Sequence, residues 1–227
     1  DMGEVEKTQQ WFDYANKQES QFLAEEMSFM KSRILISQGN QDEALLHLKN
    51  IEFTSDNPEM KYYIDGEIAF YQGKYAQAIN EFERLRNKES LNNDYFYYLF
   101  EGQPAVHLAY SYLQLEKRSQ AKEIIDGYTL SLENGKAKKS NDPAYYYNMA
   151  LINALQNKSS ETYQYLQAAI DVGWIKAWQA DMEPILGQMK QDQQFGQMMG
   201  GIRARLANMR ARNDDDNTFL LAESDSF

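Results

Sequence analysis

A unit that recurs after 34 residues constrains the fold of this chain more than any other feature of its sequence. Gln38-Gly39-Asn40 aligns with Gln72-Gly73-Lys74, and 34 residues separate the two glycines. The same interval separates Ala44 and Ala78, which follow the glycines by five positions. Glycine in a short turn lets two helices reverse direction, and a small residue lets the second helix press closely on the first. The sequence therefore predicts stacked helix–turn–helix units.

The 34-residue period and the residues at equivalent positions resemble the tetratricopeptide repeat family. Four units fit its pattern of small and aromatic residues, the second one best. The matching residues are Ser32, Leu35, Ala44 and Leu48 in the first unit, Tyr62, Gly66, Ala78 and Phe82 in the second, Leu108, Ala109, Tyr112 and Ala121 in the third, and Tyr146, Met149, Ala150, Leu166 and Ala169 in the fourth. Glu116 and Asn157 stand in place of the turn glycine, and Lys31 and Asp65 replace usual apolar residues.

This resemblance implies an all-α fold, a right-handed α-solenoid of about four helix pairs. Residues 1–19 are predicted to form an N-terminal helix, followed by repeats over residues 20–57, 58–93, 94–141 and 142–172, within a repeat region 20–172. Polar residues predict connecting loops at 87–93 and 132–142. Two helix starts are also predicted. Asp142-Pro143 provides a capping Asp and a proline for the first turn of a helix, and Pro104 is expected to open a helix over 104–115.

Residues 173–212 resemble the closing segment of many bacterial repeat proteins, in which an Asp caps each of two short helices and a Phe plugs the end. The similarity lies in Gly173-Trp174, in residues 181–186 and in residues 192–195. Such segments end repeat arrays attached to winged-helix transcription regulators, signalling kinases and nucleotide cyclases. We expect capping helices here, because the last repeat would otherwise expose its apolar face. Gly200-Gly201 is expected to kink or break the final helix.

Composition excludes several classes of function. The formal net charge of −11 repels phosphate backbones, so general nucleic-acid binding by this segment is not expected. The chain has no cysteine, and no segment approaches the 18 apolar residues of a membrane span. His47 and His107 lie in no metal-binding motif, so we predict structural or solvent-facing roles, no metal and no cofactor. No nucleophile–base pattern is present either, and we predict that the chain is not an enzyme.

The family resemblance also predicts a partner-binding groove. In tetratricopeptide proteins the first helix of each unit lines a concave face, and the core positions here are already accounted for. We therefore expect extra exposed apolar surface, which usually marks a binding site. The predicted groove residues are Phe29, Arg33, Tyr63, Glu67, Phe70, Tyr71, Val106, Tyr110, Leu113, Tyr147 and Leu151.

Residues 213–227 form an acidic tail with an apolar motif. Residues 213–217 have the composition of a solvated linker, and Phe219, Leu220 and Leu221 are predicted to dock on an apolar surface, in this molecule or in a neighbour. Docking in a neighbour would make the chain self-associate. Arg203, Arg205, Arg210 and Arg212 precede the tail, either as cations that favour a helix C-terminus or as a site for an anionic partner.

The function expected from these observations is a non-catalytic protein- or peptide-binding scaffold. The resemblance implies the repeat portion of a larger bacterial regulatory or signalling protein, and the start at Asp1 before Met2 also suggests a piece of a longer chain. A small-ligand sensor domain and a self-associating structural module are the alternatives. A closed apolar pocket would favour the sensor, and an open aromatic groove the peptide binder. The partner and the compartment, bacterial cytoplasm or periplasm, stay open.

Overall fold

A computed structural model describes residues 31–32, 35, 40–49, 58–87, 103–135 and 141–224, with the backbone alone for residues 213–224. Within these ranges every regular element is a helix and there is no strand. The prediction of an all-α fold is therefore confirmed for this part of the chain. None of its helices combines the length and the apolar character needed to cross a membrane. The helix predicted over residues 1–19 lies outside the described residues.

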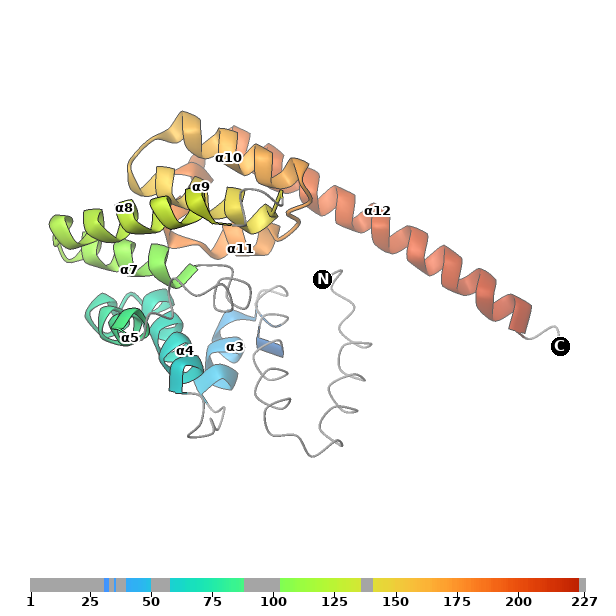
Figure 1. Cartoon of the computed structure of the whole chain (residues 1–227). Coiled ribbons are helices and arrows are strands. Elements are labelled where there is room, and N and C mark those ends of the chain that lie inside the picture. Colours follow the sequence, from blue (N-terminus) through green and yellow to red (C-terminus); the bar gives the residue numbers. More distant parts are fainter. Residues whose placement is uncertain are drawn as a thin grey trace.

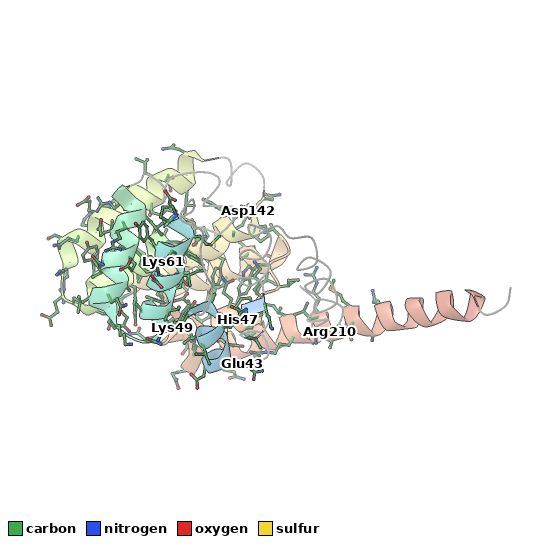
Figure 2. All side chains as sticks on the ribbon, turned by 90° about the horizontal axis from the view of Figure 1, so that it is seen from below. Glu43, His47, Lys49, Lys61, Asp142 and Arg210 are labelled. Atoms are coloured by element: carbon green, nitrogen blue, oxygen red, sulfur yellow. The ribbon has the colours of Figure 1, made fainter. Side chains whose placement is uncertain are left out.

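Three helix hairpins make up most of the body (Figure 1). They pair α4 (Pro58–Tyr71) with α5 (Tyr75–Asn87), α7 (Gln103–Gln114) with α8 (Arg118–Asn134), and α9 (Pro143–Leu155) with α10 (Ser159–Asp171). Helix α3 (Gln41–Lys49) packs on α4, and contacts of α5 with α7 and of α7 with α9 join the hairpins in chain order. Charged side chains such as Glu43, Lys49 and Lys61 lie on the outside of this body (Figure 2).

The three hairpins reverse direction through the same turn. Gly73, Glu116 and Asn157 all have a positive φ, of 70°, 59° and 57°. In each turn the backbone N–H of the following lysine donates to the carbonyl five residues earlier: Lys74 to Ala69 at 2.8 Å, Lys117 to Tyr112 at 2.9 Å and Lys158 to Asn153 at 2.9 Å. The alignment of Glu116 and Asn157 with the turn glycine is therefore confirmed. Asparagine adopts this conformation more readily than glutamate does.

The small residues of the repeat lie where paired helices press together. Ala44, Ala78, Ala121 and Thr162 occupy the equivalent position of the second helices, and all four are fully buried. Gly66 on α4 faces Phe82 on α5 so closely that a Cβ atom at position 66 would lie 2.5 Å from Cε1 of the ring. Residue size at these points therefore sets how closely the helices pack.

The predicted helix starts agree with the structure. Asp142 caps α9 by accepting a hydrogen bond from the backbone N–H of Ala144 at 2.9 Å, with Pro143 in the first turn. Helix α7 begins at Gln103, one residue before Pro104. Helix α8 continues to Asn134 and so enters the range predicted as a loop at 132–142. Leu132 is buried in the apolar core, and this burial accounts for the longer helix.

After the hairpins the chain forms α11 (Ala177–Met182), two 3₁₀ helices, η3 (Pro184–Leu186) and η4 (Met189–Gln191), and the long α12 (Gln193–Ser224). Of the two expected Asp caps, the one at Asp181 is wrong, because Asp181 lies within α11. Asp192 directly precedes α12, and its backbone carbonyl accepts a hydrogen bond from the N–H of Gly196 at 3.3 Å. The N-cap of η3 is Glu183, whose carboxylate accepts from the backbone N–H of Ile185, while Asp192 accepts a hydrogen bond from the Tyr163 hydroxyl. Phe195 is buried, as a plugging residue would be.

Helix α12 holds to the body by one face and then projects away from it in both views (Figures 1 and 2). Its buried residues are Phe195, Met199, Ile202 and Leu206, spaced by one helical turn. Gly200-Gly201 does not interrupt it, so the expected break is wrong. The four arginines lie in the middle of the helix and not at its C-terminus, and Arg203 pairs with Asp181 on α11.

The backbone of residues 213–224 continues α12. The interpretation of residues 213–217 as a linker is therefore wrong, because these residues extend a helix that starts twenty residues earlier. The predicted docking of Phe219, Leu220 and Leu221 concerns side chains outside the described ones.

Candidate functional site

The structure buries most of the residues predicted to line an open groove. The exposed fractions of Tyr63, Glu67, Phe70, Val106, Tyr147 and Leu151 are all 7% or less. The prediction that these residues form exposed surface is therefore wrong. Tyr71, Tyr110 and Leu113 are half-buried, and Phe29 and Arg33 lie outside the described residues.

The segment after α10 packs against α7 and α9, two of the helices on which these residues lie. The indole of Trp174 stacks on the Tyr147 ring, with ring centroids 4.6 Å apart and an interplanar angle of 16°. The 3₁₀ helix η3 contacts α9, and Glu183 reaches α7. Periodicity within a repeat cannot reveal this cover, because the covering residues come from a non-repeating segment.

A buried ionic triad lies under this cover. It consists of His107 on α7, Glu67 on α4 and Glu183 directly before η3. His107 Nδ1 lies 2.6 Å from Glu67 Oε1, and His107 Nε2 lies 3.1 Å from Glu183 Oε2. His107 and Glu183 are fully buried, and Glu67 is 7% exposed. Sequence reasoning assigned His107 a structural or solvent-facing role, and its burial supports the structural one, but no local signal pointed to its two partners.

The geometry of the triad fits a protonated imidazole between two carboxylates. A neutral imidazole has one N–H and can donate to one carboxylate only, whereas the imidazolium ion donates to both. Burial alone lowers the pKa of His107, but the charges and hydrogen bonds of Glu67 and Glu183 outweigh it and raise the pKa from 6.5 to about 10. The Phe70 ring stacks on the imidazole at 4.0 Å and 11°, and offers the cation an aromatic face.

Glu183 also shapes the chain beyond the triad. One of its carboxylate oxygens binds His107, and the other accepts from the backbone N–H of Ile185 at 3.1 Å. The triad thus fixes the first turn of η3 against α7. Burial, followed by the charges of Glu183 and Glu67, raises the pKa of Tyr71 well above its usual value, so Tyr71 stays neutral beside the triad. Lys190 lies near Glu183 as well, and burial lowers its pKa.

Among the described residues, no group of three or more histidine, cysteine, aspartate or glutamate side chains could hold a metal ion. His107 is not placed to act as a general base on a substrate. Both ring nitrogens of His107 are occupied by carboxylates, and the ring has no exposed surface. The arrangement can bind segments of the chain together, but it cannot reach a substrate.

We expect the stability of the protein to fall as the pH rises from about 6.5 towards 10, since the folded His107 holds its proton more tightly than the unfolded one. The stabilisation is complete below the unfolded pKa and is lost as the pH passes the folded pKa. Among the described residues, Glu67, Tyr71 and Glu183 are the titratable groups that face His107, and their interactions belong to this effect. Urea unfolding at several pH values would measure it, and NMR of the His107 Cε1–H should show no titration between pH 6 and 8. A titration midpoint near 6.5 would contradict a protonated imidazole.

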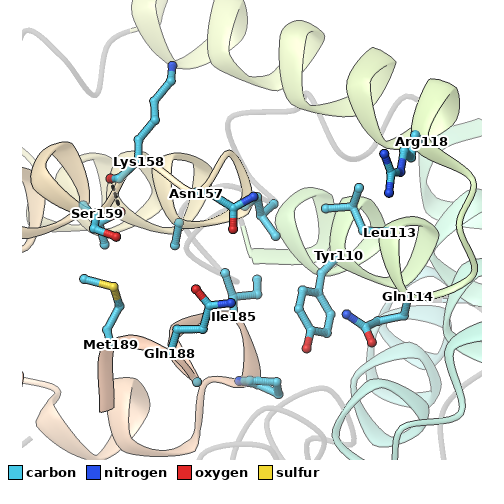
Figure 3. A pocket seen from close by; sticks show the side chains of 15 residues that line it. Tyr110, Leu113, Gln114, Arg118, Asn157, Lys158, Ser159, Ile185, Gln188 and Met189 are labelled. Carbon is cyan, nitrogen blue, oxygen red and sulfur yellow. Dashed lines mark hydrogen bonds between the residues drawn. The ribbon is translucent and has the colours of Figure 1, made fainter. Parts of the chain in front are cut away.

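A pocket of about 650 Å³ lies at the end of the hairpins where the turns and the covering segment meet. Its wall combines α7, the first residue of α8, the end of α9, the α9–α10 turn, the start of α10, and the chain around η3 and η4 (Figure 3). Tyr110 and Leu113, two of the predicted groove residues, line it. The structure thus places two of the predicted groove residues in a pocket and six of them in the buried interior.

The lining of the pocket has one apolar and one polar component. Leu113, Leu155, Ile185 and Met189 supply apolar surface, and Gln114, Asn157 and Gln188 supply carboxamides. The three carboxamides form no hydrogen bond with another described residue. Burial, and then the neighbouring Tyr75, raises the pKa of Tyr110 to about 12, so its hydroxyl stays neutral.

The two charged residues of the lining are both cations, Arg118 and Lys158. Figure 3 shows the Arg118 guanidinium beside Leu113, whereas the Lys158 ammonium points away from the other labelled residues. None of the fifteen lining residues is acidic, although the whole chain carries a formal charge of −11.

Comparison of the chain with protein-family models, with curated proteins and with solved structures finds no match.

Proposed function

We propose that this chain is a non-catalytic scaffold that binds a peptide or an extended segment of another protein in the pocket between the turns and η3–η4. The observation that carries the proposal is the lining of that pocket. The carboxamides, which no described residue hydrogen-bonds, offer N–H donors and a carbonyl acceptor, as a peptide group requires. Apolar side chains beside them can hold a side chain of the bound segment. Because these groups lie at the junction of several elements, binding needs the complete C-terminal fold.

The burial of the triad also supports a non-catalytic role. The only histidine of the described hairpins is held between two carboxylates and has no access to solvent. The resemblance to the closing segments of bacterial regulators adds a second proposal, that the chain is the repeat portion of a larger regulatory or signalling protein.

Selection from a library of randomised heptapeptides on the purified chain, followed by calorimetry of the enriched peptides, tests the proposal. The substitution Leu113→Trp fills the pocket and should weaken binding by about tenfold or more. Leu130→Trp is the matched control, because Leu130 is 60% exposed on α8 and does not line the pocket. It should leave binding unchanged.

Two other outcomes would favour the alternatives. If no peptide is enriched but small molecules raise the melting temperature of the wild type and not of Leu113→Trp, the pocket belongs to a ligand sensor. If neither binds, and light scattering shows a dimer or larger assembly, the chain is a self-associating module. Equal binding by the two tryptophan variants would place the peptide elsewhere on the surface.

A further inference from the structure

The cations of the pocket contrast with the charge of the protein around it. An acidic chain repels anions on average, yet the charged residues that line this pocket are basic. Arg118 forms no ion pair with another described residue. The neighbouring cation on the same helix, Lys122, instead pairs with Asp126. A guanidinium at a pocket that none of the described residues pairs with is available to an anionic group of a ligand.

We propose that the pocket recognises a carboxylate on an otherwise apolar peptide. This inference rests on the proposed peptide-binding function and names the chemical class of the peptide. The carboxylate binds Arg118, the carboxamides of Gln114, Asn157 and Gln188 bind the peptide backbone, and an apolar side chain packs on Ile185 and Met189.

The chemistry of the pocket favours a carboxylate over a phosphate. The planar guanidinium donates two parallel hydrogen bonds to the two oxygens of one carboxylate. A phosphate brings nearly two negative charges, and Arg118 is the single cation of the lining whose charge lies on the pocket side (Figure 3). The negative charge of the rest of the protein also repels a dianion more strongly than a monoanion, and so weakens phosphate binding more than carboxylate binding.

The test uses two heptapeptide libraries on the full chain, one with free C-termini and one with amidated C-termini. We expect enrichment of Asp or Glu next to an apolar residue, or of an apolar residue at a free C-terminus. The two libraries separate a side-chain carboxylate from a terminal one. Each enriched peptide is then resynthesised in three variants. In the first, Asn or Gln replaces the acidic residue; in the second, the C-terminus is amidated; in the third, phosphoserine replaces the acidic residue. Loss of the carboxylate should weaken binding by about tenfold.

Arg118→Glu and Lys122→Glu form the matched pair of variants. Both substitutions lie on α8 and change the net charge by the same amount, but only Arg118 lines the pocket. Arg118→Glu should weaken binding of the enriched peptides by about tenfold or more. A new selection on this variant should enrich peptides with basic residues. Lys122→Glu should change the affinity by less than about twofold.

The outcomes test the carboxylate inference and the proposed peptide-binding function separately. Equal losses in both variants, enrichment of neutral peptides, or tighter binding of phosphoserine peptides would overturn the carboxylate inference. If Leu113→Trp abolishes binding of such neutral peptides, the proposed function holds while the inference fails. If the enriched peptides bind the Leu113→Trp variant as well as the wild type, the pocket is not the site and both proposals fail.

Discussion

His107→Leu should lower the free energy of unfolding by about 3–5 kcal/mol, because it leaves two buried carboxylates without their shared counter-ion. Leucine replaces most of the volume of the imidazole, so the loss of charge and of two hydrogen bonds dominates. Glu183 is fully buried and Glu67 nearly so, and solvent cannot replace the imidazolium. Urea unfolding at pH 7 gives the free-energy difference directly.

Two further substitutions provide an internal check. Without the cation, the negative charges of Glu67 and Glu183 stay buried close together. Adding Glu67→Gln and Glu183→Gln should restore part of the stability at neutral pH. His47→Leu is the matched control, since His47 on α3 is not part of the triad, and should change stability by less than about 1 kcal/mol. Equal effects of the two histidine substitutions would contradict a special role of the triad.

Ala78→Leu should destabilise the protein by about 1–3 kcal/mol through overpacking. Ala78 is fully buried where α5 presses on α4, and neighbouring helices close the space around it. Ala76→Leu, two residues earlier on the same helix, places the same side chain at an exposed position and should have little effect. Thermal unfolding of the two variants compares them under identical conditions. If Ala78→Leu and Ala76→Leu had the same melting temperature, the register of the repeat would be wrong.

The predicted groove shows why a repeat pattern alone can mislead. The sequence register placed Tyr63, Phe70 and Tyr147 on the first helices, and the structure agrees. Their expected exposure was wrong, because helical position says which side of a helix a residue occupies and not what else covers that side. Trp174 covers Tyr147, and His107 stacks on Phe70.

Repeated local chemistry determined the helix hairpins. A turn with positive φ, a fully buried small residue after it and a capped start of α9 depend on residues within one unit, so the sequence predicted them. The tertiary structure alone decided the triad and the pocket. Glu67 and Glu183 lie 40 and 76 residues from His107. Contacts over such distances depend on how the C-terminal segment folds back over the first helices, and no periodicity within the repeats encodes that path.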